Sequence, residues 1–252
     1  WHDGSLFALP LNCTYQHFNG SGDEPARFFS VNSAPIVFNL FHHEDFVFNT
    51  PRDFQDRFDG DPEYFSGKGK AYPGRVWDTN FIADARSFAL EDWVERGGGG
   101  KNVMLEMASG SMAAHISEFP IGTYKKAHRH GPGFNVIIIK GKGFSMFWRQ
   151  GEEPKRYDWQ DGSVFTPPAM MWHQHFNTGA TGARYLPPRL GGIKYSLGEG
   201  FGDITKVDKD VKAGGNQIEY FDEDPNIRKM FEDELAKSGT TTKMNPDFYK
   251  RP

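Results

Sequence analysis

Between residues 101 and 197, apolar and polar side chains alternate in short runs, and Gly, Pro or Asp separate one run from the next. Alternation with a period of two is typical of β-strands that bury one face, because successive side chains point to opposite sides of a sheet. Gly141-Lys-Gly143 is expected to join two of these strands as a hairpin. The predicted strands cover residues 101–108, 111–120, 125–130, 134–140, 144–150, 155–158, 163–166, 172–176 and 191–197.

Helix signals lie on both sides of this strand-rich stretch. Pro51 and two phenylalanines spaced four residues apart predict a short helix over 51–58. Near the C-terminus, Asp224 and Gly239 mark the start and stop of a helix predicted over 224–237, which carries one apolar stripe. We expect this second helix to pack on the exterior of the strands.

The first part of the chain repeats a later part. Gln-His-Phe-Asn ends both copies of the longest match, which runs at a constant offset of 158 (161 minus 3). The matched pairs are residues 3–19 with 161–177, 26–28 with 183–185, and 36–40 with 193–197. Such a repeat indicates two units of one fold. Residues 1 to about 41 are therefore expected to close a first unit, whose other strands come from an upstream segment or another chain.

Three histidines stand where a metal site could form. His128 and His130 are two residues apart on a predicted strand, so both rings project from one face. His173 follows about forty residues later on another predicted strand and can complete a facial set of three nitrogens. One histidine on a strand is usually structural, but three at these spacings favour a metal ion with open coordination positions.

The residues around these histidines resemble the two motifs of the cupin family. The first motif is matched by Gly122, five further residues, His128-Arg-His130, and a Gly-x-Gly turn about ten residues later. The second is matched by Gly162, Pro168, His173 and Asn177. The resemblance covers residues 101 to 200 or so, and it implies an all-β, antiparallel jelly-roll (cupin) barrel with the metal in its mouth.

One position departs from the family pattern. Cupins often supply a glutamate as a fourth ligand, and counting from His130 that place is taken by Phe134. The resemblance therefore supports a three-His site, similar to that of several iron-dependent cupin dioxygenases.

Together with the repeat, the resemblance implies a bicupin whose first barrel is incomplete in this chain, plus short flanking helices. The first copy has Tyr15 at the place of His173, so we expect no equivalent metal site there. It keeps His17, and its counterpart His175 is therefore expected to be held for structure rather than for metal. The expected divisions are 1–60 (closing strands and a helix), 61–100 (connecting segment), 101–200 (metal-binding barrel) and 201–252 (extension with a helix).

Three neutral imidazoles suit a borderline divalent cation better than Mg(II) or Ca(II). Following the resemblance, we expect Fe(II), with Zn, Ni or Mn as alternatives. Neutral ligands leave both positive charges of the cation uncompensated. An anionic bidentate substrate, such as an enolate, a catecholate or a 2-hydroxy-carboxylate, would restore the charge balance.

Side chains near the ligands form the predicted substrate pocket and the predicted proton-transfer groups. By strand parity, large apolar residues are expected to face the metal, although each is also explained as ordinary filling of the barrel. The predicted substrate-binding residues are Phe134, Phe144, Met146, Trp148, Met171 and Trp172. The predicted catalytic residues are His175, Tyr124 and Gln174.

Three functions fit these observations. The first is an Fe(II)-dependent dioxygenase, an oxidoreductase that chelates an anionic aromatic or enolisable small molecule. The second is a non-redox lyase, isomerase or hydrolase in which the metal is a Lewis acid and Tyr124 or His175 is the base. The third is a cupin that binds a small molecule without catalysis.

Composition excludes some partners. A net charge of -4 and a pI near 6.2 offer no basic surface for nucleic acid or an anionic membrane. The longest apolar run, Val136–Ile139, is far shorter than the roughly 20 residues of a membrane span. Cys13 is the single cysteine, which fits a reducing compartment, so we expect a cytoplasmic protein. A homo-oligomer is expected from the resemblance.

Overall fold

The computed structural model describes residues 1–110, 112–131, 134–192 and 206–251. Strands dominate this part of the chain and the helices are short, so the predicted all-β class is confirmed. The strands are β1 (Leu6–Phe7), β2 (Lys70–Tyr72), β3 (Val76–Asp78), β4 (Phe81–Ile82), β5 (Glu91–Asp92), β6 (Lys101–Glu106), β7 (Met112–Phe119), β8 (Val136–Lys140), β9 (Gly143–Trp148), β10 (Lys155–Trp159), β11 (Val164–Phe165), β12 (Trp172–Asn177), β13 (Ala183–Leu186) and β14 (Pro188–Leu190). The α-helices are α1 (Ala34–Phe41), α2 (Glu44–Phe48) and α3 (Pro225–Lys237), and the 3-10 turns are η1 (Val94–Arg96), η2 (Val211–Ala213), η3 (Tyr220–Asp222) and η4 (Pro246–Tyr249).

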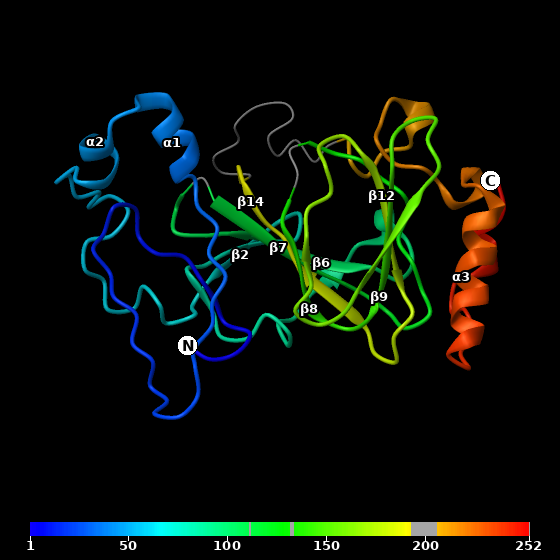
Figure 1. Ribbon diagram of the computed structural model, residues 1–252, viewed down its shortest axis with the longest axis horizontal. Coiled ribbons are helices and arrows are strands. Elements are labelled where there is room, and N and C mark those ends of the chain that lie inside the picture. The colour runs from blue at the N-terminus through cyan, green and yellow to red at the C-terminus, as the bar shows by residue number, and fades with distance from the viewer. Residues whose placement is uncertain (111, 132–133, 193–205, 252) are drawn as a thin grey trace.

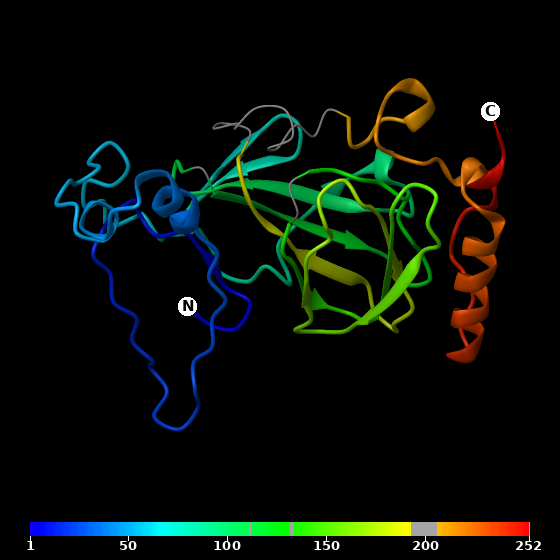
Figure 2. The ribbon, with the colours of Figure 1, turned by 45° about the horizontal axis from the view of Figure 1, so that its top comes forward.

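Two sheets form the body of the molecule (Figure 1, Figure 2). The larger sheet has the order β11-β8-β13-β7-β6-β3-β2, with β14 on β7 and β5 on β6. The smaller sheet has the order β10-β9-β12. Pairing is antiparallel in both sheets except between β3 and β6. Two antiparallel sheets of this kind are the layers of a jelly roll.

The Gly141-Lys-Gly143 turn carries the chain from one sheet to the other. Before it, β8 pairs with β11 and β13; after it, β9 pairs with β10 and β12. The predicted hairpin between these two strands is therefore wrong. Gly141 has a φ of 102°, and a Cβ there would lie 2.9 Å from the Cα of Ala183, so this corner requires glycine.

Helix α3 covers the outer face of the smaller sheet (Figure 1), as the sequence predicts. Its buried stripe, Ile227, Phe231 and Leu235, packs with rings from β9 and β12. The rings of Phe144 and Phe176 stack with centroids 4.5 Å apart, and Phe231 approaches Phe176 to 5.7 Å. Alternate side chains of β9 and β12 thus point to the outer face, where most of them pack in this cluster.

The N-terminal region differs from its predicted elements. Residues 51–58 form turns rather than a helix, and the helices of this region are α1 and α2. Helix α1 covers 36–40, which the repeat matched to 193–197, a part of a predicted strand that lies outside the described residues. A proline in the first turn of α1 has the backbone conformation that a helix start requires. Among the described residues no strand pairs with this short apolar run, so its local preference for a helix is not opposed.

Side chains that correspond in the two copies of the repeat differ in burial. Phe18 is 74% exposed, whereas its counterpart Phe176 is fully buried. Tyr15 is also exposed, whereas His173 is buried. That residues 1 to about 41 complete a separate unit with strands from elsewhere stays a prediction, as do the domain boundaries.

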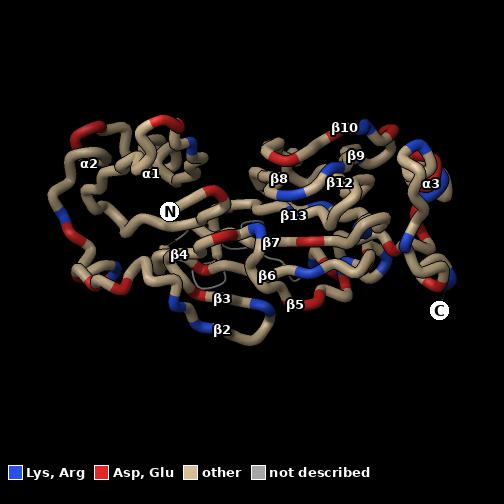
Figure 3. The backbone as a smooth tube through the Cα atoms, turned by 90° about the horizontal axis from the view of Figure 1, so that it is seen from below, with Lys and Arg blue, Asp and Glu red and all other residues tan. Residues whose placement is uncertain are grey.

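Exposed charged residues contribute little to this architecture. Figure 3 shows acidic and basic residues interspersed along both sheets and α3. On α3 they form short-range pairs such as Arg228 with Glu232 and Lys229 with Asp233, and exposed pairs of this kind are each worth only about 0.3–0.5 kcal/mol. Among the described residues, no helix combines the length and the apolar character that crossing a membrane requires.

The repeat provides a matched pair of substitutions. Phe176→Ala should lower the free energy of unfolding by about 3–5 kcal/mol, because it opens a cavity in the ring cluster under α3. Phe18→Ala should change it by no more than about 0.5 kcal/mol, because that ring faces solvent in this chain. Urea denaturation of both variants measures the difference. A large loss of stability in Phe18→Ala would show that this ring is covered by a partner.

Candidate metal centre

Main-chain hydrogen bonds join the segment that carries His128 and His130 to β12. His128 N donates to His173 O at 2.9 Å, and His173 N donates to His128 O at 2.8 Å. Met170 N donates to His130 O at 2.8 Å. The strand predicted over 125–130 is thus extended, but it pairs through single bridges rather than a regular ladder. This pairing places the three imidazoles side by side.

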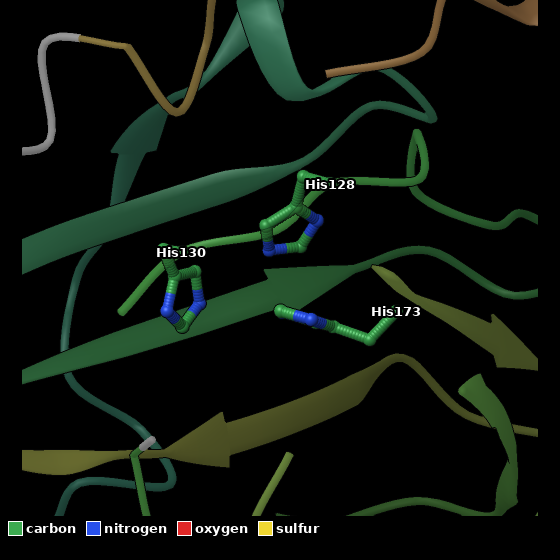
Figure 4. Close-up of side chains that lie close together, drawn as sticks. All are labelled: His128, His130 and His173. Carbon is green, nitrogen blue, oxygen red and sulfur yellow. The ribbon is translucent and has the colours of Figure 1, made fainter. Parts of the chain in front are cut away.

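The three rings converge as the sequence predicts (Figure 4). One ligand nitrogen from each of His128, His130 and His173 lies within 4.8 Å of the other two. The ring centroids of His128 and His173 are 4.1 Å apart, and those of His130 and His173 are 4.8 Å apart. In a facial set with metal–nitrogen bonds of about 2.1 Å the nitrogens lie about 3.0 Å apart, so a cation that takes all three would draw them closer together.

Neighbouring carbonyl groups fix the tautomer of two ligands. His128 Nδ1 lies 3.2 Å from the carbonyl oxygen of Lys126, and His173 Nδ1 lies 2.9 Å from that of Met171. A carbonyl oxygen only accepts hydrogen bonds, so each Nδ1 carries the proton and donates it. Each Nε2 therefore keeps its lone pair, which is the state that a metal ion requires. His130 Nδ1 is buried without a hydrogen-bond partner among the described residues.

The imidazoles are held neutral. Burial lowers the pKa of His173 to about 4, and it lowers the pKa values of His128 and His130 well below their usual value. Neutral rings accept a cation near pH 7 without first releasing a proton. The residues present therefore fit a divalent metal ion with three nitrogen ligands.

The triad forms part of the wall of a cavity between the two sheets. His173 and His175 come from β12, while the larger sheet and its edges supply Met104, His115, Phe134, Val136, Tyr185 and Arg189. The cavity volume is about 60 Å³, well below the roughly 150 Å³ of a cavity that holds one benzene molecule. As it stands the cavity has room for a few water molecules, and a one-ring molecule would enter it completely only if its walls moved.

Phe134 is a predicted substrate-binding residue that does line this cavity. Its ring stacks on His130 with a centroid distance of 4.4 Å and an interplanar angle of 27°. It stands at the position where the resemblance led us to look for a glutamate, and this part of the wall is apolar. Asp208, the acidic residue among the described cavity walls, is engaged by Trp93 and Arg96.

Four other predicted pocket residues face the opposite way. The register of β12 on β9 pairs His173 with Phe147 and His175 with Ser145, so those residues share the cavity face. The alternate positions of both strands point to the outer face under α3 or beside it. The parity prediction was wrong because it carried the face of β8 across a turn that changes sheets. The residues affected are Phe144, Met146 and Trp148 on β9. Trp172 was chosen for its place just before His173, but neighbours on a strand point to opposite faces, and its ring stacks with Trp148.

Met171 contributes to the site through its main chain rather than through the predicted contact of its side chain with the substrate. Its carbonyl oxygen accepts the Nδ1 proton of His173, so its main chain orients a ligand. The side chain of Met171 is half-buried and lies outside the described cavity walls.

Two predicted catalytic residues also lie on the outer face. Tyr124 donates its hydroxyl to Glu223, and Gln174 Nε2 donates to the other carboxylate oxygen of Glu223 at 3.1 Å. Tyr124 is fully buried in the cluster beneath α3, with its ring 5.0 Å from that of Phe231. Both residues therefore secure the C-terminal segment, and neither is placed to exchange protons with a molecule in the cavity.

The third predicted catalytic residue, His175, does line the cavity. Its Nδ1 lies 2.6 Å from Ser145 Oγ, which also accepts a hydrogen bond from Trp159 Nε1 at 2.9 Å. All three groups are satisfied if Ser145 donates to Nδ1, and Nε2 then carries the proton. His175 is therefore a hydrogen-bond donor to the cavity rather than a base.

The structure also brings in residues that the sequence patterns did not single out. Tyr185 lines the cavity, and its hydroxyl lies 3.1 Å from Nζ of the buried Lys125. Burial raises the pKa of Tyr185, but the ammonium group of Lys125, a hydrogen bond with Ser117 and the charge of Arg96 together outweigh this effect, and the pKa is lowered. Arg96 and Arg189 line the cavity as well. In the repeat Tyr185 corresponds to Phe28, and this match gave no reason to assign Tyr185 a role in the site.

A glycine run was the one sequence signal for Arg96. Gly97 and Gly98 have φ values of 73° and 59°, and a Cβ on Gly97 would lie 2.5 Å from the hydroxyl of Tyr220. The run Gly97–Gly100 is thus a tight, largely buried turn, and it fixes Arg96 beside the cavity.

The sequence matches no protein-family model and no curated protein. Among solved structures it is similar to the cupin domain of Schizosaccharomyces pombe Cnp3 (18% identity, TM-score 0.36, covering 45% of this chain and 76% of that chain). It is also similar to a cupin 2 conserved barrel domain protein from Rhodopseudomonas palustris (18%, 0.36, 57% and 94%). A third is the formate complex of Lactobacillus farciminis oxalate decarboxylase (14%, 0.38, 66% and 49%), of which the chain spans about half. At these identities and TM-scores the likenesses carry no information on chemistry.

Replacing a ligand should abolish tight metal binding. In His128→Ala, His130→Ala and His173→Ala the affinity for Co(II) should fall by more than about 100-fold, because loss of a hydrogen bond to a ligand alone costs 10–100-fold. His175→Asn is the control, since its side-chain oxygen can take the place of Nδ1 toward Ser145. Equilibrium dialysis with elemental analysis gives the stoichiometry. Full binding by His173→Ala, or its loss in His175→Asn, would contradict the assignment.

The Glu223 cluster makes stability depend on pH. Burial raises the pKa of Glu223 from 4.5 to about 7, although hydrogen bonds from Tyr124 and Gln174 act to lower it. Because the folded pKa exceeds the unfolded one, the stabilisation is complete below pH 4.5 and is lost as the pH rises through about 7. Glu223→Gln should therefore raise the free energy of unfolding at pH 8 by at most about 3 kcal/mol and leave it unchanged at pH 4. Denaturant titrations at both pH values test this; a variant less stable than the native chain at pH 8 would refute it.

Proposed function

We propose that this chain is a metal-dependent enzyme of the cupin type, and that it is an Fe(II) dioxygenase acting on an anionic, chelating aromatic or enolisable small molecule. His128 and His173 would hold the metal through Nε2, and His130 would supply the third nitrogen. Ferrous iron, when bound, would supply open coordination positions and electrons for the reduction of dioxygen.

The observation that carries this proposal is the state of the three imidazoles. They converge in a buried cavity, they are neutral, and hydrogen bonds to main-chain carbonyls direct two free Nε2 lone pairs toward the same point. A purely structural histidine cluster would satisfy both nitrogens of each ring within the protein. In the described residues the Nδ1 atoms of His128 and His173 are hydrogen-bonded, and their Nε2 atoms are left for an external partner.

The other residues of the cavity would bind and orient the substrate. Phe134 and Val136 form apolar walls that keep out water, and the ring of Phe134 is placed to pack against a flat molecule beside His130. His175 would donate the Nε2 proton to an oxygen of the bound anion. The cavity volume of about 60 Å³ favours a small substrate, and an aromatic ring would enter completely only if the walls moved.

The absence of a carboxylate from the described triad favours an anionic substrate. A cation held by neutral imidazoles keeps its full charge, so it attracts a bidentate enolate or catecholate more strongly than a two-His-one-carboxylate site would. Phe134 stands where a glutamate would have removed one charge.

A second candidate function is supported by Tyr185. Tyr185 lines the cavity, and its hydroxyl lies 3.1 Å from the ammonium group of Lys125, which acts to lower its pKa and favours the phenolate. Tyr185 is thus a better-placed base than Tyr124 or His175. A non-redox lyase, isomerase or hydrolase with Zn(II), Ni(II) or Mn(II) as Lewis acid would use such a group.

Oxygen consumption distinguishes the two functions. Protein reconstituted with Fe(II) under argon should consume dioxygen with at least one member of a panel of catechols, hydroxybenzoates and 1,3-diketones. Uptake should fall to background without iron and in His128→Ala and His173→Ala, because each loses a ligand. The control His2→Ala, which removes an exposed histidine, should retain full uptake.

Turnover under argon with zinc would overturn the dioxygenase assignment. Loss of that turnover in Tyr185→Phe would then establish the second candidate.

A further inference from the structure

In addition to the neutral histidine ligands, the cavity contains buried cationic groups. Arg96 is 1% exposed and Arg189 is 3% exposed, and both line the cavity. Among the described residues, Nε and Nη1 of Arg96 and Nε of Arg189 have no hydrogen-bond partner. Removing a guanidinium group from water without replacing its hydrogen bonds is costly, so such atoms are normally paired. Within the described part of the chain these atoms are therefore available to a ligand.

Arg96 is held rigidly in this position. Its Nη2 donates to Asp208 Oδ1 at 2.7 Å, and its guanidinium carbon lies 4.6 Å from the ring centroid of Trp93. Trp93 Nε1 donates to the other oxygen of Asp208 at 2.9 Å, and the carbonyl oxygen of Arg96 accepts a hydrogen bond from Lys126 N at 3.2 Å. One edge of the guanidinium is thus anchored. Nε and Nη1, which carry three N–H groups between them, remain for a ligand.

Arg189 approaches the triad from the larger sheet. It belongs to β14, and its guanidinium carbon lies 5.7 Å from the ring centroid of Phe134. The same ring stacks on His130 at 4.4 Å. A molecule that reaches the metal ligands along Phe134 would therefore also pass the guanidinium of Arg189.

Cationic side chains gather on the cavity walls although the chain has a net charge of -4. Arg96 pairs with Asp208, Arg75 lies 3.9 Å from Glu95, and Glu106 interacts electrostatically with Arg189. A bound divalent cation would add two positive charges that these carboxylates do not offset. One chelating oxygen pair with a single negative charge leaves part of that charge for a second anionic group of the same molecule.

We infer that the substrate carries a carboxylate in addition to its metal-chelating oxygens, and that Arg96, assisted by Arg189, binds this carboxylate and determines specificity for it. The inference rests on the proposed function, because the chelating end of the molecule is assigned to the histidine triad. A carboxylate fits better than a bulkier tetrahedral anion, since the cavity is small and a planar group matches the N–H groups of a guanidinium.

The test compares two probes of the same size that differ in charge. Protein loaded with Co(II) under argon is titrated with 3,4-dihydroxybenzoate and with 3,4-dihydroxybenzamide, and the visible spectrum of Co(II) reports binding. The native chain should bind the benzoate at least about 10-fold more tightly than the benzamide, as expected for charge-assisted hydrogen bonds. The more electron-withdrawing amide favours chelation by the catechol, so any bias in the comparison works against the expected result.

Substitution of the arginine should remove this preference. In Arg96→Met the benzoate should lose about 10-fold in affinity, while the benzamide should change by less than about 3-fold. Arg189→Met, a second variant in case the first fails to fold, should reduce the preference in the same direction. Arg156→Met is the matched control, because that arginine pairs with Asp158 and Glu234 on the exterior and lies over Phe144. It should keep the full preference.

The outcomes separate this inference from the proposed function. If the native chain loads Co(II) but binds both probes equally, binds neither, or keeps its preference in Arg96→Met, the carboxylate site is refuted while the metal site stands. If Co(II) does not load at all, the proposed function itself is refuted.

Discussion

The pair of main-chain hydrogen bonds between His128 and His173 is the constraint on which the site depends. Each residue donates its amide to the carbonyl of the other, which aligns an otherwise irregular segment with β12. Because both partners of this pair are themselves ligands, the backbone pairing sets the separation of their rings directly. The carbonyls of Lys126 and Met171, two residues before each ligand, then set the tautomers. Position and protonation state are thus determined by the same two stretches of chain.

The two faces of β12 divide the molecule into a chemical side and a structural side. His173 and His175 face the cavity, whereas Gln174 and Phe176 face the cluster that binds α3. A substitution on one face alters the site, and a substitution on the other alters the docking of the C-terminal segment. The short-range alternation of a strand makes this division possible over only a few residues.

The sequence was sufficient to predict the metal ligands, the strand-rich class and helix α3, because each has a local signature. Spacing identified His128, His130 and His173, and a capped apolar stripe identified α3. The walls of the cavity could not be predicted in the same way. The alternation of side chains shows which residues share a face only within one sheet. At Gly141 the chain passes into the other sheet, so the residues of β9 that were assigned to the cavity were placed on the wrong face. For Arg96 the only local signal was the glycine run that follows it. Its position depends on a hydrogen bond to Asp208, which is distant in sequence from both Arg96 and the triad, and on its contact with Trp93.

The central claim is that three imidazoles hold one metal ion in the cavity between the sheets. Iron K-edge X-ray absorption on protein reconstituted under argon tests it most directly, because the outer-shell scattering counts imidazole rings. The account predicts about three histidine ligands, with nitrogen and oxygen scatterers at about 2.0–2.2 Å. A spectrum with one imidazole or none, or with sulfur in the first shell, would contradict it.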